Sequence, residues 1–169
     1  VFISDQSALV TSFSDSEIIV ETTSGFTAPG LGDVLIIGSS GVATRLVDGW
    51  TQSAIQSISP SFGQRGPTIT ITGTGLLAGG STIDRLRLTS ADATLISQSQ
   101  TEVVGIINTV TVAVDVLQDV ELIMDNGQKV IATEGFTYKE AGAIGDISPI
   151  SGQVGTRVTI TGARLIGHG

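Results

Sequence analysis

The sequence lacks cysteine and is poor in histidine, aromatic residues and charge. It has 169 residues, with no cysteine, one histidine, 4% aromatic and 14% charged residues. The missing cysteine excludes a disulfide scaffold, thiolate metal sites and cysteine catalysis. A single histidine nearly excludes histidine-rich metal sites and histidine-based catalytic triads. A net charge of −8 and a pI near 4.3 argue against nucleic-acid binding, which needs a basic surface.

Long apolar runs and a leader segment are also missing. No stretch of 18 apolar residues occurs, so the sequence predicts no membrane span. The chain starts at Val1 without a basic segment followed by an apolar one, and it stops at Gly169 just after an expected strand. We therefore expect a piece of a longer polypeptide or a processed product.

The residues that are present favour β-structure. Val, Ile and Leu are interleaved with Thr and Ser, which is the composition of strands. Alternating polarity predicts strands at 68–72, 86–89, 109–114 and 120–124, and a last strand that reaches Tyr138. Asp125-Asn126-Gly127 predicts a hairpin with a type I′ turn. We expect an all-β protein of antiparallel two-sheet sandwiches. The expected core comprises Ile58, Ile69, Ile71, Leu86, Leu88, Val112, Val114, Val120, Leu122 and Phe136.

The sequence repeats itself with a period of roughly 85–89 residues. Residues 55–80 match residues 144–169 at 13 of 26 positions. Residues 33–51 align with 119–137, which places Trp50 on Phe136, and Ser16–Ile19 align more weakly with Thr101–Val104. This period is too long for a solenoid and suits a string of small sandwich domains.

The repeats divide the chain into three regions. We predict that the first region (1–52) is the latter part of one repeat, the second region (55–138) is complete, and the third region (144–169) holds only opening strands. The predicted linkers are Ser53-Ala54 and Lys139–Ala143, which are short enough for nearly rigid stacking.

The repeated residues resemble a known family. An opening Ile-x-x-Ile-Ser-Pro, a Gly-x-x-Gly, a Thr-Ile-Thr-Ile-Thr-Gly strand and a closing Gly-Phe-Thr-Tyr are similar to the immunoglobulin-like, plexin, transcription-factor (IPT/TIG) domain. The resemblance covers all three regions and implies immunoglobulin-like sandwiches in tandem. It does not fix a function, because the family serves in receptors, adhesins, transcription factors and enzyme accessory domains.

Few residues are candidates for chemistry. The glycines of 73–80 resemble a phosphate loop but lack the following Lys-Ser/Thr and helix, so a turn is the better interpretation. The acidic run Asp115, Asp119, Glu121 and Asp125 is either a solvated face, which we favour, or a Ca²⁺ cradle. His168 stands alone near the terminus. We predict no catalytic residues, no cofactor and no metal, hence not an enzyme.

Three groups of residues are candidates for binding or modification. Arg65, Arg85 and Arg87 form either a basic patch or ordinary solubilising charges. Trp50 and Phe136 are interpreted as plugs between the sheets, with carbohydrate stacking as the alternative. No N-glycosylation acceptor occurs. Candidate O-glycan sites, if they are not simply outward-facing strand residues, are Ser12, Ser14 and Ser16, together with the Ser59-Pro60 and Ser148-Pro149 pairs.

These observations leave three functions to consider. The first is a structural subunit of an extracellular filament or surface assembly, partnered by copies of itself and by glycans. The second is the stalk or binding module of a cell-surface adhesin or receptor. The third, a DNA-binding domain, is disfavoured by the acidic pI.

The two partial repeats carry the sharpest hypothesis. Together they are about one repeat long, so we expect the opening strands of one unit to complete the first region of the next, head to tail. Either separate chains exchange strands, or one long polypeptide supplies both parts. The residues predicted at this assembly interface are Ile144, Ile147, Val158, Ile160, Leu165, Val1 and Ile3.

Overall fold

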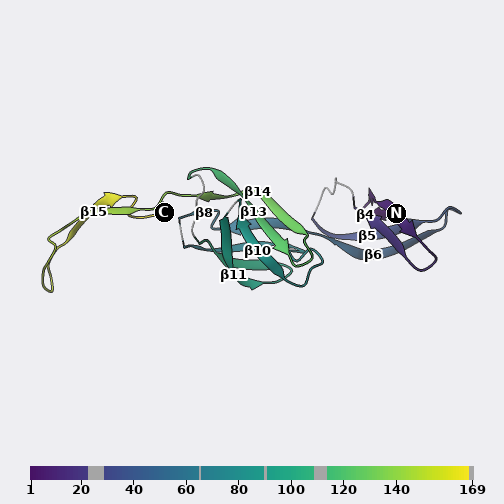
Figure 1. Ribbon diagram of the computed structural model, residues 1–169, viewed down its shortest axis with the longest axis horizontal. Helices are drawn as coiled ribbons and strands as arrows, with labels where there is room; N and C mark the ends of the chain where they lie inside the picture. The colour runs from purple at the N-terminus through teal and green to yellow at the C-terminus, as the bar shows by residue number, and fades with distance from the viewer. Residues whose placement is uncertain (23–28, 65, 90, 109–113, 168–169) are drawn as a thin grey trace.

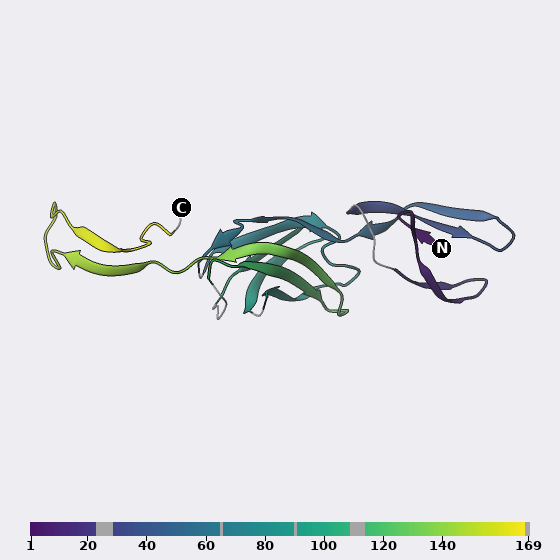
Figure 2. The ribbon, with the colours of Figure 1, turned by 90° about the horizontal axis from the view of Figure 1, so that it is seen from above.

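The computed structural model describes the whole chain except residues 23–28, 65, 90, 109–113 and 168–169. In the described part every regular element is a strand, which confirms the all-β prediction. That part holds no helix with the length and hydrophobicity to cross a bilayer. The strands form three groups that follow one another along the long axis of the molecule (Figure 1; Figure 2).

The second region is a closed sandwich made from one curled sheet of eight strands. Their order is β7-β9-β12-β11-β10-β13-β14-β8, and every pair is antiparallel except β8 with β14. The curl occurs at β11, whose first residues pair with β10 and whose later residues pair with β12. The strands are β7 (Ala54–Ser59), β8 (Phe62–Gly63), β9 (Thr68–Thr74), β10 (Ile83–Leu88), β11 (Ala91–Gln98), β12 (Glu102–Ile106), β13 (Leu117–Met124) and β14 (Lys129–Tyr138).

The core of the chain lies inside this sandwich. Alternation decides which side chains point inward, as β9 and β13 show by burying every second residue. Of the predicted core, seven residues are buried and Ile58 packs partly buried against them. The seven are Ile69, Ile71, Leu86, Leu88, Val120, Leu122 and Phe136.

The prediction for Val114 in the second region is wrong, and strands β11 and β12 were not predicted. Val114 is 42% exposed and lies in a turn before β13, so it is not a core residue. Val112 and the rest of the predicted strand up to Ala113 lie outside the described residues, as does Val110. Alternation does not predict β11 and β12, because Ala, Ser and Gly interrupt the apolar pattern of these strands.

The Asn-Gly hairpin forms, but its turn is not type I′. Only Gly127 has a positive φ (79°), whereas type I′ requires one at both central residues. The amide of Gly127 donates to the carbonyl of Met124, and the amide of Met124 donates to the carbonyl of Gln128. This is a three-residue loop that ends in a glycine bulge, the next most common hairpin after the two-residue forms.

The first region contains two small sheets that are not hydrogen-bonded to each other. One has the order β2-β1-β5-β6, and the other is the hairpin β3-β4. The strands are β1 (Phe2–Ile3), β2 (Gln6–Ser7), β3 (Leu9–Phe13), β4 (Ile18–Glu21), β5 (Gly30–Ile37) and β6 (Ala43–Gln52).

The third region is a single hairpin of β15 (Ala143–Ser148) and β16 (Thr159–Ala163). Ser53 alone separates β6 from β7, and residues 139–142 separate β14 from β15. Ala54 and Ala143, which were predicted to be linker residues, therefore begin strands. Both links are short (Figure 2), and a hydrogen bond from Gln64 Nε2 to the carbonyl of Glu140 braces the second one.

Candidate assembly interface

The first region repeats the strand pairing of β10 to β14, residue for residue. Leu31 pairs with Thr51 and Val34 with Leu46, just as Leu117 pairs with Thr137 and Val120 with Ala132, 86 positions later. The hairpin β3-β4 likewise repeats β11-β12 at an offset of 85, including the irregularity at its centre. The first region therefore has the same local fold as the latter part of the second.

The bulge in each copy is held by an aspartate at the equivalent position. The Asp119 carboxylate accepts a hydrogen bond of 2.9 Å from the amide of Glu134, whose φ is 55°. The Asp33 carboxylate accepts a 2.9 Å bond from the amide of Asp48, whose φ is 52°. The two aspartates thereby stabilise Glu134 and Asp48 in a left-handed backbone conformation, which is otherwise typical of glycine.

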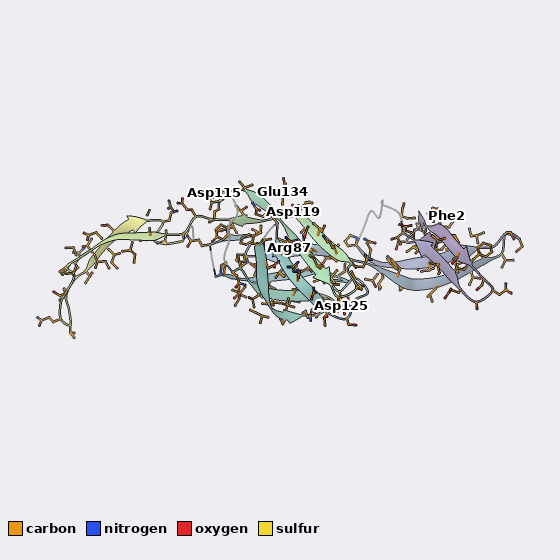
Figure 3. The ribbon with its side chains drawn as sticks, in the orientation of Figure 1. Phe2, Arg87, Asp115, Asp119, Asp125 and Glu134 are labelled. Carbon is orange, nitrogen blue, oxygen red and sulfur yellow. The ribbon has the colours of Figure 1, made fainter. Side chains whose placement is uncertain are left out.

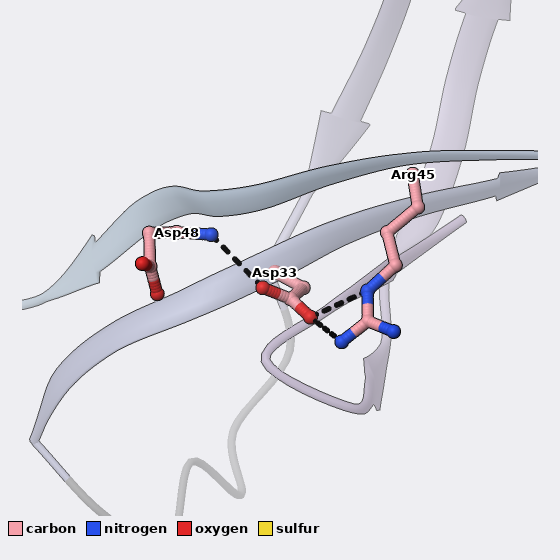
Figure 4. Close-up of polar contacts among 3 residues, drawn as sticks. All are labelled: Asp33, Arg45 and Asp48. Atoms are coloured by element: carbon pink, nitrogen blue, oxygen red, sulfur yellow. Dashed lines mark hydrogen bonds and ion pairs between the residues drawn. The ribbon is translucent and has the colours of Figure 1, made fainter.

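Asp33 has a further partner, Arg45, which has no equivalent at Asp119 among the described residues. Arg45 donates to the Asp33 carboxylate from Nε at 2.6 Å and also from Nη2 (Figure 4). The Asp48 amide, followed by the Arg45 guanidinium, holds the pKa of the Asp33 carboxyl below its usual value, because both favour the charged form. In the second region, Ile131 stands where Arg45 would be.

The third region repeats the pairing of β7 with β9, at an offset of 89. Ile147 pairs with Ile160 as Ile58 pairs with Ile71, and the irregularity falls at the same place. Gly155 and Gly66 share a left-handed φ of 92° and 93°. The third region thus consists of the two strands that the first region does not have.

The shared pairing is accompanied by opposite burial. Trp50 is 36% exposed, whereas its counterpart Phe136 is fully buried. Ile160 is 50% exposed, whereas its counterpart Ile71 is fully buried. Burying an exposed aliphatic side chain is worth about 1.5–3 kcal/mol, so both partial regions present apolar faces with a large unrealised stabilisation.

The structure divides the predicted interface residues into two sets. Five form the apolar side of the third region and are exposed: Ile144, Ile147, Val158, Ile160 and Leu165. Val1 and Ile3 differ from them. Val1 is half-buried, and Ile3 is 4% exposed because β1 packs inside the first region. Ile18 and Trp50 were not among the predicted interface residues, yet they are exposed on the open side of the first region. The sequence repeat, which aligns them with the buried Val103 and Phe136, was the signal that could have identified them.

A cavity of about 960 Å³ opens beside this side of the first region. Its walls include Ile3, Val20 and Trp50, the last residues of β6, and the β9–β10 turn of the second region. Within the described residues, β4 pairs only with β3, so its other edge is free at this cavity. In the second region the corresponding edge of β12 is paired with β9.

The acidic run does not converge on a site. Figure 3 shows Asp115 and Asp119 near one end of β13 and Asp125 at the other. Asp115 accepts a 2.8 Å bond from Lys139 Nζ, and Asp125 accepts one of 3.0 Å from the amide of Ser81. Among the residues that the structure describes, no group of three His, Cys, Asp or Glu side chains could hold a metal ion.

The remaining sequence candidates also have local structural roles. Arg85 and Arg87 lie 3.2 and 3.3 Å from Asp92, so they are ion-paired and do not form a free basic patch; Arg65 lies outside the described residues. Gly75, Gly79 and Gly80 lie in the turn between β9 and β10, as predicted, whereas Gly73 belongs to β9. His168 lies outside the described residues.

The three candidate O-glycan serines lie at the β3-β4 hairpin and are exposed. Ser14 Oγ accepts hydrogen bonds from the amides of Ser16 and Glu17, at 3.3 and 3.1 Å. Ser99 makes the same two bonds in the second region, so Ser14 has a structural role in the turn. Ser12 and Ser16 use no hydroxyl in this way within the described residues.

Comparison with known proteins agrees with the fold. The sequence model of the IPT/TIG domain matches residues 53–138. A structure of the plexin A4 extracellular region, domains 1 to 10, is similar over 95% of this chain, with 20% identity and a TM-score of 0.53. SGBP-B of the Bacteroides ovatus mixed-linkage glucan utilization locus, in complex with a mixed-linkage heptasaccharide, aligns over 85% of this chain and 40% of its own, with 13% identity and a TM-score of 0.41. The chain spans 14% of the plexin chain. No curated protein matches the sequence.

Proposed function

The chain belongs to the IPT/TIG domain family, and from this premise we propose that it is a structural segment of an extracellular, head-to-tail array of such domains. In this proposal, the opening strands of one unit complete the first region of the next and so build a filament or surface assembly. The observation that carries it is the opposite burial of equivalent residues, such as Trp50 and Phe136.

The geometry favours a growing assembly over a closed dimer. The surface that offers strands is in the third region and the surface that lacks them is in the first, at the other end of the molecule (Figure 2). A contact between two different surfaces is heterologous and propagates unless a rotation closes it. The short links at Ser53 and 139–142 support a stiff array.

Localisation and chemistry are part of the same proposal. We place the chain outside the cell or at its surface, since the plexin relative is itself an extracellular region. Domains of this family typically act as non-enzymatic binding or structural modules, and we propose no catalysis for this chain. Ser12 and Ser16 are the better proposed O-glycan sites, because Ser14 is occupied in the turn.

A second candidate is the stalk or binding module of a receptor or adhesin. The tandem domains of the plexin extracellular region favour it. In that version the completing strands come from the same long polypeptide. Electron microscopy of the native material separates the two: periodic fibres support the filament, and isolated rods on a cell surface support the stalk. An intact mass far above 17.3 kDa would show that one long polypeptide supplies both partial repeats.

The assembly itself is tested with the isolated chain. Trp50 is the single tryptophan, so its fluorescence reports whether the open side of the first region becomes covered. We expect the emission to move to shorter wavelength as protein concentration rises, in step with particles seen by sedimentation and with fibres seen by electron microscopy.

A matched pair of variants controls this experiment within one hairpin. Ile160→Asp should abolish the shift and the fibres, because Ile160 corresponds to the buried Ile71. Ile150→Asp should leave both unchanged, since Ile150 is fully outside and corresponds to the exposed Ser61. A chain that stays monomeric at high concentration, with Trp50 emission unchanged, would contradict the proposal.

A further inference from the structure

We infer that strand β16 of a second copy of this chain adds to the free edge of β4, antiparallel and in one register, with Ile160 opposite Ile18. This inference rests on the proposed function and names the contact that the assembly uses. The same docking places Ser151-Gly152 of the second copy beside Thr51-Gln52, in parallel. The second copy would therefore pair through its backbone with two strands of the first region, β4 and the end of β6.

The register comes from the complete repeat in the same chain. There β9 pairs with β12 so that Ile71 lies opposite Val103 and Thr70 opposite Val104. Ile160 lies 89 positions after Ile71 and is its equivalent in the third region. Ile18 lies 85 positions before Val103 and is its equivalent in the first region. Because both hairpins keep their internal pairing unchanged, only one mutual position reproduces the complete domain. A slip by one residue would turn the apolar side of β16 outward.

The second edge follows in the same way. In the second region β8 pairs in parallel with the end of β14, Phe62 with Thr137 and Gly63 with Tyr138. The corresponding residues are Ser151 and Gly152 in the third region and Thr51 and Gln52 at the end of β6. Residues 50–53, Val20 and Glu21 line the 960 Å³ cavity, which thus opens between the two edges that the inferred strands would occupy.

Charge supports this register independently of the apolar residues. The position opposite Glu21 is Arg157, equivalent to the pair Ile106 and Thr68 in the second region. Both side chains are exposed, and Arg157 has no ion pair among the described residues. The docked strands would bring the two opposite charges face to face, where cross-strand pairs of unlike charge are favourable.

Cysteine cross-linking tests the register, since the chain has no cysteine of its own. Ile19 and Thr159 face outward at directly opposite positions, equivalent to Val104 and Thr70. Opposed residues in an antiparallel pair have Cα atoms about 4.5–5.5 Å apart, within reach of a disulfide. Residues two positions off are separated by about 7–8 Å. Equimolar I19C and T159C chains are mixed under mild oxidation, and I19C with T161C is the matched control.

We expect the I19C–T159C mixture to give a mixed dimer at least ten times more abundant than the control mixture, with little dimer from either variant alone. Sedimentation of the same mixtures under reducing conditions reports association separately. If the reduced chains associate but the two mixtures cross-link equally, or neither cross-links, the register is wrong while the proposed function stands. If the reduced chains do not associate, the proposed function fails together with the inference.

Discussion

The first and second regions share their strand pairing, their bulges and their turns, yet only the second has a closed core. Ser4 and Thr89 even share a left-handed φ, at 48° and 51°, at equivalent turns. What separates the two regions is the presence of β7 and β9, which belong to the sandwich of the second region and have no counterpart among the described residues of the first. Local pairing is therefore independent of closure in this fold, whereas burial depends on two strands that come from the start of the repeat.

The largest expected effect is a difference between Phe136→Ala and Trp50→Ala. Phe136 is fully buried, so its truncation should lower the free energy of unfolding of the second region by about 3–5 kcal/mol. Trp50→Ala in dilute chain should cost about 1 kcal/mol or less, because its ring is partly in water already. Urea titration followed by circular dichroism measures both. Equal losses would mean that the first region is closed in solution.

The next effect concerns the paired strands β9 and β16. Ile71→Ala should cost about 2–5 kcal/mol, since Ile71 is fully buried. Ile160→Ala in dilute chain should change the unfolding free energy by less than about 0.5 kcal/mol and should weaken self-association instead. Denaturant titration and sedimentation equilibrium provide the two readouts. A loss below about 0.5 kcal/mol for Ile71→Ala would show that β9 does not pack as described.

A smaller effect is expected from pH in the first region. Because the pKa of Asp33 is lower in the folded than in the unfolded chain, its stabilisation is complete above the unfolded value and is lost as pH falls through the folded value. The urea midpoint reported by Trp50 fluorescence should therefore fall on acidification below about pH 4. Asp33→Asn should remove this part of the pH dependence, and Arg45→Gln should remove only some of it. An unchanged profile in Asp33→Asn would exclude the carboxylate as its source.

The smallest effect is expected from reversing the charge of Glu21 or Arg157, because these residues would form one exposed ion pair at the free edge of β4. Exposed ion pairs contribute about 0.2–1 kcal/mol, so Glu21→Arg or Arg157→Glu should weaken association a few-fold in low salt. The chain that carries both changes should recover, because the unlike charges are opposed again. Sedimentation at two salt concentrations checks this, and additive losses in the double variant would argue against the pairing.

Sequence patterns were sufficient where the structure follows local rules. Alternation at Thr68–Thr72 predicted which side of β9 is buried, and the period of 85–89 residues predicted that the same pairing recurs. The Asn126-Gly127 turn was located correctly but its type was not, because the hairpin is closed by a bulge one residue longer than a type I′ turn allows. Val114 was misplaced because apolar alternation continues into a turn.

The repeat period, the all-β class and the family were determined by the sequence alone, since each depends on residue spacing along the chain. Only the tertiary structure decided which apolar residues are covered. Ile71 and Ile160 occupy the same place in the same Thr-Ile-Thr pattern, and one is buried while the other is half exposed. Burial depends on neighbours brought in from distant strands, which no local pattern contains. The same reason explains why Ile3 was predicted at the interface but lies inside the first region, and why the exposure of Ile18 and Trp50 became visible only in the packing.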